Sequence, residues 1–395
     1  MCGIAGIIGQ EDEPLARRMI AALAHRGPDY TGLLVAGGVS LAHARLSVID
    51  TSAEANQPMV SADGTVAVVF NGEIYNFAEL RQELEDKGQV FKTNSDTEVL
   101  LALYAKEGEQ CVRRLSGMFA IALYDFSAKR LMLARDRMGE KPLYWSHEGD
   151  VVTFASELNA LLVPGLATRN LSLSALACYL QLDYVPTPHA LLDGVHKLEP
   201  GTVALFTKGK PVETHAFWEP PRRVSVLSES AALDRLDELL AATVSRELVG
   251  DVPLGVFLSG GLDSSAIAYY AQKNSAAPIH TFSIGFDEPD FDESAYARDV
   301  AAHIGSVHHE RIVRAEDALA LVTELPDVLS EPIADASVIP TLLLSRFARE
   351  SVTVALGGDG GDELFAGYPT FSADTISSPY RALPSWVRKG IRAGV

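Results

Sequence analysis

The feature that most constrains how this chain can fold is a strand that ends in two glycines and leads into a serine-rich helix start. Residues 252–258 form a short apolar run, typical of a central strand in a parallel sheet. Gly260 and Gly261 then allow the tight turn that such a connection needs, and Ser264 and Ser265 open the expected helix. N–H groups and hydroxyls at a helix N-terminus attract anions, so this turn is predicted to bind phosphate.

The residues of this turn narrow the kind of phosphate site. The turn lacks the spaced glycine and the Lys-Ser/Thr pair of a Walker A loop. It carries Asp263 instead, which would repel a phosphate unless a cation lay between them, so Mg²⁺ is expected. The alternative is an ordinary strand–turn–helix connection. A bare Gly-Gly pair favours that alternative, whereas the serines together with the aspartate favour the binding site.

The turn resembles the pyrophosphate loop of ATP-dependent synthetases, which split ATP into AMP and pyrophosphate and activate a carboxylate as an acyl-adenylate. The resemblance implies Mg²⁺ ligands at Asp263 and Asp362, and groups that act during adenylation at Asp359 and Glu363. It also implies that another part of the chain supplies a nucleophile, for which nitrogen is expected. The implied ATP contacts are Leu258, Ser259, Gly260, Gly261, Asp263, Ser264, Ser265, Ile284, Gly357 and Gly358. Gly357 departs from the serine of the family, which removes one hydroxyl contact.

The rest of the second half alternates strands with helices. Strands are expected at residues 279–286, 310–313 and 352–356, with helices between them. This alternation predicts a doubly wound parallel α/β domain, in which ligands sit beyond the carboxyl ends of the strands. Residues 357–363 follow one of these strands, so they should face residues 259–265 across the crevice. His308 and His309 are adjacent on a strand and should point to opposite faces, which argues against a metal site.

The N-terminus carries the second candidate site. Residues 1–8 read as an apolar strand, and an apolar strand at a chain end indicates that the end is held inside the fold. Cys2 becomes the first residue if Met1 is removed. A free α-amine has a pKa of about 7.7–8.0 and can act as a general base, and a thiolate is a strong nucleophile. The alternative is a small buried cysteine.

Four segments resemble a class II glutamine amidotransferase domain, an N-terminal-nucleophile hydrolase: residues 1–4, 25–29, 71–76 and 95–98. The resemblance implies a four-layer αββα sandwich. Independently, short strands at regular spacing predict stacked sheets; they include residues 66–70, 117–125 and 131–136.

The amidotransferase resemblance assigns roles to individual residues. Cys2 would attack the amide of glutamine, and Asn71 and Gly72 would donate to the oxyanion. Arg45 would bind the α-carboxylate through a bidentate pair, and Asp96 the α-ammonium. Taken singly, Arg45 and Asp96 are ordinary surface charges. The pocket is completed by Leu46, Val48 and Glu73.

Composition limits the partners and the compartment. The chain has 33 basic and 52 acidic residues and a net charge of −19, which argues against nucleic acid and anionic membranes as partners. No apolar run reaches membrane-spanning length, and the start lacks the pattern of a signal peptide. Its 3 cysteines are too few for a disulfide framework. A cytoplasmic location is therefore expected.

Together these features are similar to the asparagine synthetase B family over essentially the whole chain. Residues 1–215 are assigned to the amidotransferase domain and residues 216–395 to the synthetase domain. The expected reaction is glutamine-dependent asparagine synthesis, with ammonia passing internally to an aspartyl-adenylate. Two alternatives stay open: a relative that amidates another carboxylate, and a truncated subunit that acts by interaction. A homodimer is the family expectation.

Two further expectations concern individual segments. Residues 135–145 form a charge-rich run that is interpreted as a solvated loop without chemistry. Family members run further than Val395, so the synthetase domain is expected to be C-terminally incomplete, without later helices and a lysine that acts on the ATP phosphates.

Overall fold

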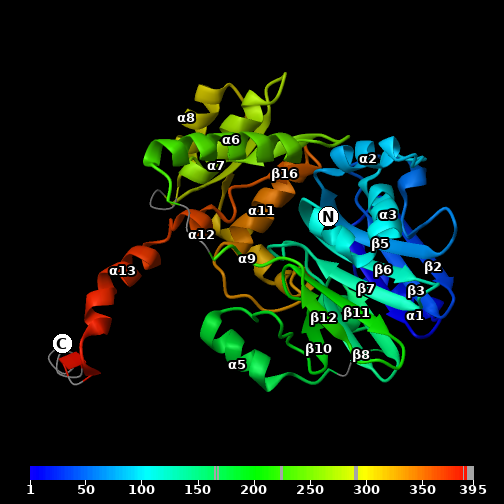
Figure 1. Cartoon of the computed structure of the whole chain (residues 1–395). Helices are drawn as coiled ribbons and strands as arrows, with labels where there is room; N and C mark the ends of the chain where they lie inside the picture. The colour runs from blue at the N-terminus through cyan, green and yellow to red at the C-terminus, as the bar shows by residue number, and fades with distance from the viewer. Residues whose placement is uncertain (164–165, 167–168, 223–225, 289–291, 386, 389–395) are drawn as a thin grey trace. The chain divides into compact units, whose positions relative to one another are not determined.

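The computed structural model describes residues 1–163, 166, 169–222, 226–288, 292–385 and 387–388 (Figure 1). Val395, where the synthetase domain was expected to be incomplete, lies outside the described residues. The chain divides into two compact units, which are described separately. The first comprises Met1–Arg235, Val249–Val252 and Ala315–Thr341, and the second comprises Leu236–Leu248, Pro253–Arg314 and Leu342–Val395.

Two antiparallel sheets form the centre of the first unit, and among the described residues each has six strands. In spatial order, one sheet contains β10 (Val195–Lys197), β8 (Tyr144–Glu148), β9 (Val151–Ala155), β1 (Gly3–Ile8), β3 (Val39–Arg45) and β2 (Tyr30–Ala36). The other contains β12 (Glu213–Ala216), β11 (Thr202–Thr207), β7 (Arg130–Arg135), β6 (Gly117–Asp125), β5 (Val66–Ile74) and β4 (Met59–Val60).

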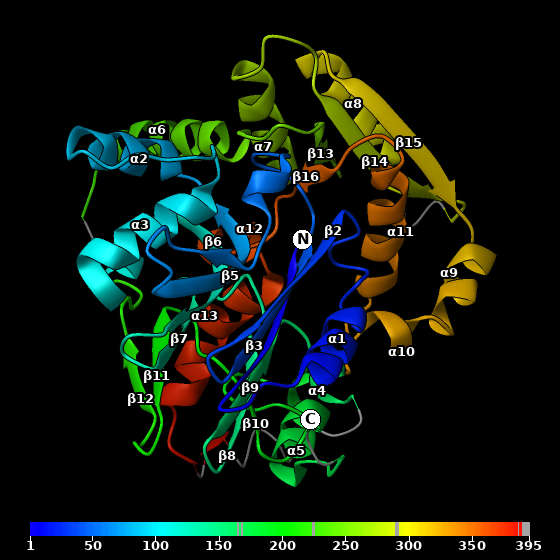
Figure 2. The ribbon, with the colours of Figure 1, turned by 90° about the vertical axis from the view of Figure 1, so that its right-hand side faces the viewer.

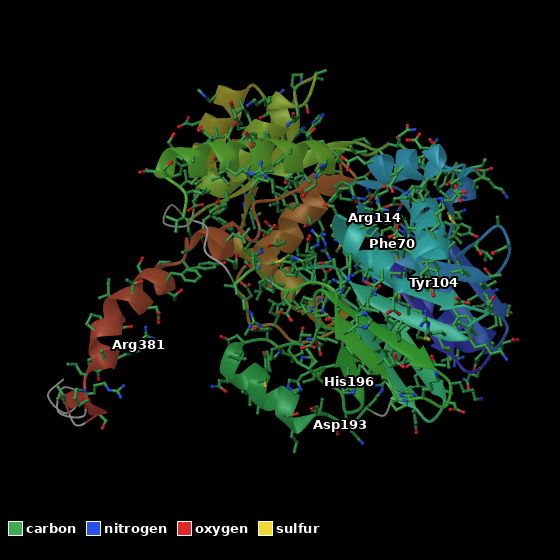
Figure 3. The ribbon with its side chains drawn as sticks, viewed as in Figure 1. Phe70, Tyr104, Arg114, Asp193, His196 and Arg381 are labelled. Carbon is green, nitrogen blue, oxygen red and sulfur yellow. The ribbon has the colours of Figure 1, made fainter. Side chains whose placement is uncertain are left out.

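Helices cover the outer face of each sheet (Figure 2). Helices α1 (Glu13–Ala21) and α4 (Leu158–Leu161) pack on the sheet that contains β1. Helices α2 (Phe77–Asp86) and α3 (Asp96–Glu107), with the 3₁₀ turn η2 (Gly108–Arg114), pack on the sheet that contains β5. Phe70 and Tyr104 belong to this second outer core (Figure 3).

The alternation of side chains along each strand explains the layers. In β1, Ile4 and Ile8 lie in the core between the sheets, whereas Ala5 and Ile7 lie in the core against α1. The core between the sheets contains residues from both of them. The order of layers is therefore helix, sheet, sheet, helix, which confirms the predicted αββα sandwich.

Further elements complete the first unit or run across the unit boundary. Glu331 lies in a segment of this unit far along the chain, and it accepts hydrogen bonds from the Tyr144 hydroxyl at 3.0 Å and the Leu191 N–H at 2.7 Å. The further elements of the first unit are η1 (Ala53–Ala55), α5 (Leu173–Leu182), α9 (Ala315–Val322) and α10 (Leu325–Val328). Helices α6 (Glu229–Glu247) and α11 (Val338–Arg349) contain residues of both units.

The second unit contains a parallel sheet, four-stranded among the described residues, in the order β15 (Val307–Val313), β14 (His280–Phe286), β13 (Leu254–Phe257) and β16 (Val354–Leu356). Residues of α7 (Leu262–Lys273) and α8 (Ser294–Ile304) pack with Val256 on one face. Residues of α11 pack with Phe282 on the other face. Apolar packing on both faces confirms the doubly wound α/β fold. The last described helices are α12 (Gly361–Phe365) and α13 (Pro369–Ala382).

The interpretation of residues 135–145 as a solvated loop is wrong. Asp136 has no exposed surface, and Lys141 is 6% exposed. The Asp136 carboxylate accepts N–H hydrogen bonds from Phe119, Met138, Glu140 and Lys141 at 3.0–3.1 Å. The charge of Asp136 therefore has a structural role inside the fold, because its carboxylate pairs with backbone N–H groups that have no partner in a neighbouring strand.

In the described part of the chain, none of the helices combines the length and the apolar character needed to cross a membrane.

Candidate functional site

Several of the predicted glutamine-site residues lie on the inner faces of the two sheets. In β3, Val39 and Leu41 belong to the core between the sheets, so Arg45 lies on the same side of its strand. In β5, Ala67 and Val69 belong to that core, so Asn71 and Glu73 face it as well. Strand alternation thus brings residues from distant parts of the sequence to one end of the layer between the sheets.

Cys2 lies just before β1 and is held by side chains and by the residue that follows β3. Its Sγ is 3.4 Å from the Leu46 N–H nitrogen and 3.5 Å from the Leu46 carbonyl oxygen. Arg26 Nε donates to the Cys2 carbonyl oxygen at 2.8 Å, and Arg26 Nη1 pairs with Glu157 Oε1 at 2.6 Å. The backbone at Cys2 is therefore anchored in the fold and β1 is buried, as the apolar sequence predicted, whereas Met1 is 56% exposed.

Burial sets the protonation states at this terminus. Removal from water lowers the pKa of the Met1 amine to about 6. Burial also raises the pKa of the Cys2 thiol above its ordinary value. At neutral pH the structure thus holds a neutral amine, which can accept a proton, beside a protonated thiol, which must lose one before it can attack a substrate.

Asn71 and Gly72 lie in a buried and closely packed part of β5. Asn71 is 1% exposed, and neither its Nδ2 nor its Oδ1 has a hydrogen-bond partner among the described residues. Such a group costs free energy in a folded protein and calls for an explanation, of which a missing ligand is one. A Cβ on Gly72 would lie 2.0 Å from the Met118 carbonyl oxygen, so glycine is required at this position.

Arg45 is buried and currently bonded to neutral acceptors. Its Nη1 donates to the Ser52 carbonyl oxygen and to Asn56 Oδ1, both at 2.7 Å, and its Nη2 donates to the Asp50 carbonyl oxygen. The hydrogen-bond acceptors are therefore two backbone carbonyl groups and a side-chain amide, none of which carries a charge.

Asp96 and Glu73 place two carboxyl groups near enough to Cys2 to affect the pKa of its thiol. Asp96, at the start of α3, is 5% exposed, and its Oδ2 accepts the Ile74 N–H at 3.0 Å. Burial raises the pKa of Asp96 to about 6. Burial, and then the charge of Asp96, raise the pKa of Glu73 well above its ordinary value. A carboxylate whose charge raises the pKa of a neighbouring carboxyl group creates a negative environment that favours a nearby cationic group.

In the second unit, the two glycine-rich loops meet at one edge of the parallel sheet. Strands β13 and β16 are parallel neighbours, so the loops that follow them leave the sheet on the same side. A Cβ on Gly358 would lie 2.8 Å from the Ser264 nitrogen, and a Cβ on Gly361 would lie 2.4 Å from the Asp263 carboxyl carbon. The structure therefore brings residues 357–361 against residues 263–264, and it needs glycine for this approach.

The serines of the first loop differ in what they bind. Ser264 Oγ accepts the Ser259 N–H at 3.2 Å and lies 3.0 Å from Ser259 Oγ, so these hydroxyls brace the loop internally. The Ser265 hydroxyl oxygen is buried and has no hydrogen-bond partner among the described residues. Of the two helix-opening serines, only Ser265 therefore has an unpaired side-chain hydroxyl in the part of the chain that the structure describes.

The remaining predicted synthetase residues are spread around this edge. Leu258 is buried at the end of β13, and Ile284 is half-buried in β14. Asp362 is half-buried in the first turn of α12. Asp359 is exposed, and Glu363 accepts a hydrogen bond from the Tyr368 hydroxyl at 3.0 Å. Within the described residues, no group of three or more His, Cys, Asp or Glu side chains is arranged to hold a metal.

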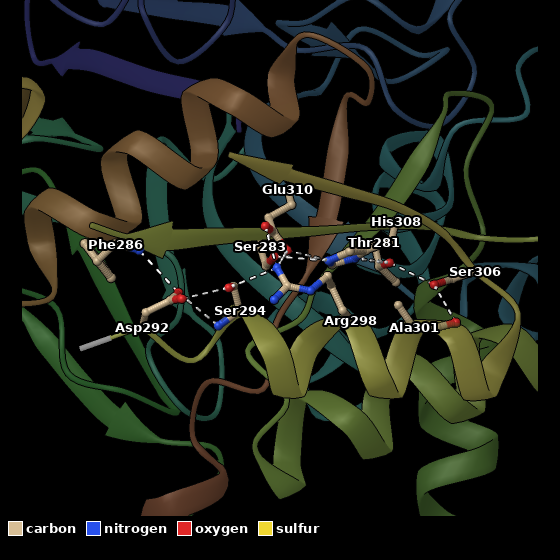
Figure 4. Close-up of polar contacts among 10 residues, drawn as sticks. All are labelled: Thr281, Ser283, Phe286, Asp292, Ser294, Arg298, Ala301, Ser306, His308 and Glu310. Atoms are coloured by element: carbon tan, nitrogen blue, oxygen red, sulfur yellow. Dashed lines mark hydrogen bonds and ion pairs between the residues drawn. The ribbon is translucent and has the colours of Figure 1, made fainter. Parts of the chain in front are cut away.

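A row of polar contacts joins α8 to β14 and β15 (Figure 4). Asp292 Oδ1 accepts the Phe286 N–H at 3.3 Å and the Ser294 N–H at 3.1 Å, which fixes the end of β14. His308 Nε2 lies 3.2 Å from Ser283 Oγ, whereas the adjacent His309 contacts His280 at 2.9 Å. The two histidines bind different partners on opposite faces of the sheet, as predicted.

Comparison with known proteins adds independent information. The family described as glutamine amidotransferase domain matches residues 1–218, and the family described as asparagine synthase matches residues 235–394. Glutamine-hydrolyzing asparagine synthetase 1 of Bacillus subtilis is 35% identical over 98% of this chain. The putative glutamine-hydrolyzing asparagine synthetase 2 of Methanocaldococcus jannaschii is 33% identical over 98% of this chain, and the match covers 79% of that relative's length. The amidase chry2 of Gibberella zeae is 31% identical over 98% of this chain.

The αββα sandwich and the parallel α/β unit define a two-domain protein that joins an amidotransferase domain to an asparagine synthase domain. The chain belongs to the family of glutamine-hydrolyzing asparagine synthetases. It spans 62% of the length of the Bacillus subtilis and Gibberella zeae relatives.

Sequence reasoning missed the side chains that support the first site. Arg26 and Glu157 hold the Cys2 backbone, and Gln57 and His43 contact β5 beside Asn71. His43 carries a usable signal, because it follows Val39 and Leu41 at the period of two that marks the inner face of a strand. Arg26 lies in residues 25–29, one of the segments that carry the amidotransferase resemblance, but the sequence does not show that it pairs with Glu157 or what Gln57 contacts, since these partners are distant in sequence.

Proposed function

We propose that the first domain, residues 1–215, hydrolyses glutamine to release ammonia, with Cys2 as nucleophile. The observation that carries this proposal is the buried Asn71 amide, unpaired among the described residues. Asn71 faces the layer that Cys2 adjoins, and the charges of Glu73 and Asp96 influence the pKa of Cys2. Membership of the amidotransferase family supports the same reaction.

The residues of the first domain have the following proposed roles in the hydrolysis of glutamine. The α-amine, which belongs to Cys2 once Met1 is removed, takes the proton of the thiol, and the thiolate attacks the amide carbon of glutamine. Asn71 Nδ2 and the Gly72 N–H donate to the oxyanion. Collapse of the intermediate releases ammonia and leaves a thioester that water hydrolyses. Arg45 binds the α-carboxylate and Asp96 the α-ammonium of glutamine. The wall of the pocket is formed by Leu46, Val48 and Glu73.

The second domain, residues 216–395, is proposed to form aspartyl-AMP from aspartate and ATP, which ammonia converts into asparagine. The proposed ATP contacts are Leu258, Ser259, Gly260, Gly261, Asp263, Ser264, Ser265, Ile284, Gly357 and Gly358. Asp359 and Glu363 act during adenylation. The approach of the two loops at Gly358 and the unpaired Ser265 hydroxyl support a phosphate-binding edge.

Mg²⁺ fits the donor set at this edge. The Asp263 carboxylate lies against Gly361, and the carboxylate of the following residue, Asp362, lies against Gly367. Carboxylate oxygens are the ligands that Mg²⁺ prefers. Asp263 and Asp362 are proposed to hold the ion, which neutralises phosphate charge when it is bound.

Another carboxylate is the second candidate acceptor. One relative, 31% identical over 98% of this chain, is named an amidase rather than an asparagine synthetase. The family resemblance alone therefore does not identify the carboxylic acid that is amidated.

ATP–pyrophosphate exchange with a panel of acids tests the synthetase assignment. Aspartate is expected to stimulate exchange above every other acid. Gly358→Val is the variant that should disrupt the proposed ATP site. A Cβ at this position would lie 2.8 Å from the Ser264 backbone nitrogen, so a valine side chain would clash there. This variant should lose exchange and keep glutaminase activity. Stimulation by a different acid would replace aspartate as the acceptor, and exchange that persists in Gly358→Val would reject the proposed ATP site.

The affinity for glutamine should depend on pH through Asp96. Since the pKa of Asp96 is raised to about 6, the carboxylate gains a proton as the pH falls through that value and loses the charge that attracts an ammonium group. The KM for glutamine should therefore rise below about pH 6. In Asp96→Asn the KM should be high and independent of pH over the same range. A wild-type KM that is constant from about pH 5 to pH 8 would contradict this role of Asp96.

A further inference from the structure

His43 is a fully buried histidine between the two sheets of the first unit, and the steps proposed above do not use it. Its side chain has no exposed surface. Its Nε2 lies 3.2 Å from the Phe70 carbonyl oxygen, and its Nδ1 has no partner among the described residues. Burial lowers the pKa of His43 to about 3. The ring is therefore neutral, and the contact with a carbonyl requires that Nε2 carry the hydrogen and donate it.

The contact lies where β5 is no longer paired with β4, although it stays paired with β6 on its other side. Strand β4 pairs with β5 at Ala67 and Val68. Phe70, two residues further on, presents its N–H and its carbonyl to side chains instead. Gln57 Oε1 accepts the Phe70 N–H at 2.6 Å, and His43 donates to the Phe70 carbonyl. These side chains replace the missing strand, because buried backbone groups must be paired.

The same segment is held at its other end. The Ile74 N–H donates to Asp96 Oδ2 at 3.0 Å. Gln57 is itself fixed, since its Nε2 donates to Thr97 Oγ1 at 3.1 Å. Asn71 and Gly72 lie between these two anchored ends. The Phe70 carbonyl and the Asn71 N–H belong to one rigid peptide plane, so a hydrogen bond to that carbonyl restrains the backbone from which the Asn71 side chain projects, together with the pairing of Asn71 with Ala120 in β6.

We propose that His43 is a positioning residue that fixes the Phe70–Asn71 peptide and so keeps the Asn71 side-chain amide ready for the oxyanion. This inference rests on the proposed glutaminase function and on the assignment of Asn71 as a donor. Preorganisation matters here because a donor contributes to catalysis only if it is already aimed at the position where the charge develops. His43 acts through Asn71 and does not touch glutamine.

A double-mutant cycle on glutamine hydrolysis tests this role. Asn71→Ala alone should lower kcat by about 10²–10³-fold. His43→Leu removes the donor and should lower kcat by roughly ten-fold or more, with KM nearly unchanged, because only transition-state binding is lost. In the Asn71→Ala background, His43→Leu should cause no further loss, since residues that act through one group are not additive. His43→Gln should recover most of the activity, because its amide can reach the Phe70 carbonyl.

An inhibitor provides a second readout. The aldehyde analogue of glutamine forms a tetrahedral adduct with a thiol, so its affinity should fall by the same factor as kcat in His43→Leu. His43→Asn, whose amide ends short of Phe70, replaces His43→Leu if the leucine variant does not fold. Equal losses of kcat in the wild-type and Asn71→Ala backgrounds would overturn the inference, as would unchanged inhibitor affinity. An Asn71→Ala enzyme with full kcat would instead reject the proposed oxyanion donor itself.

Discussion

Cys2→Ala is expected to abolish the hydrolysis of glutamine, with a loss of at least about 10³-fold in kcat. The variant removes the only atom at this terminus that can form a thioester, and it leaves the surrounding hydrogen bonds to the Cys2 backbone in place. Synthesis that uses free ammonia should continue, because it does not pass through the thiol. Release of glutamate from glutamine and ammonia-dependent pyrophosphate release, measured on the same preparation, separate the two activities.

The matched control is Cys178→Ala, the same substitution in α5, which should leave both activities unchanged. The mass of the active protein should also show that Met1 has been removed, because the proposed base is the α-amine of Cys2. Glutaminase activity that persists in Cys2→Ala would show that another nucleophile does the chemistry. Full activity in protein that retains Met1 would show that the terminal amine of Cys2 is not the base.

The sequence predicts the second unit well because its information is local. The strand, the glycine turn and the helix start are contiguous, and parallel pairing follows from the alternation of strands and helices. The structure adds what a local pattern lacks. Gly358 and Gly361 are required by the close approach of Ser264 and Asp263, and that approach becomes visible only when β13 and β16 are neighbours.

The first unit shows where such reasoning ends. Periodicity predicts stacked sheets, and the αββα order came from the family resemblance. The anchors of the site depend on contacts across long sequence separations: Arg26 meets Glu157 131 positions away, and Gln57 meets Thr97 40 positions away. The sequence alone does not distinguish a charged residue that distant contacts bury from one on the surface. For this reason the prediction that the run containing Asp136 is a solvated loop is wrong.

Asp136→Ala is expected to cause the largest loss of stability. Its carboxylate accepts backbone N–H groups from β6 and from the turn after β7, and its own backbone N–H donates to the Phe119 carbonyl at 2.8 Å. Alanine would leave the buried N–H groups of Phe119 and Lys141 unsatisfied, at about 1–3 kcal/mol each before relaxation, and would free the part-buried N–H groups of Met138 and Glu140 as well. Allowing for water entry, the free energy of unfolding of the first unit should fall by roughly 3–5 kcal/mol, which lowers its Tm by roughly 6–20 °C.

Asp150→Ala is the control that separates this effect from the loss of any carboxylate. Asp150 is half exposed and pairs with Lys208 at 3.3 Å, and such a surface pair contributes at most about 1 kcal/mol. Urea unfolding followed through glutaminase activity and tryptophan fluorescence would compare the two variants, because Trp145 and Trp218 both pack in the first unit. Asp136 has no exposed surface, whereas Asp150 is half exposed. If the Asp136→Ala and Asp150→Ala variants unfolded at the same urea concentration, water or a relaxed backbone would satisfy the freed N–H groups. The Asp136 carboxylate would then not be needed for stability.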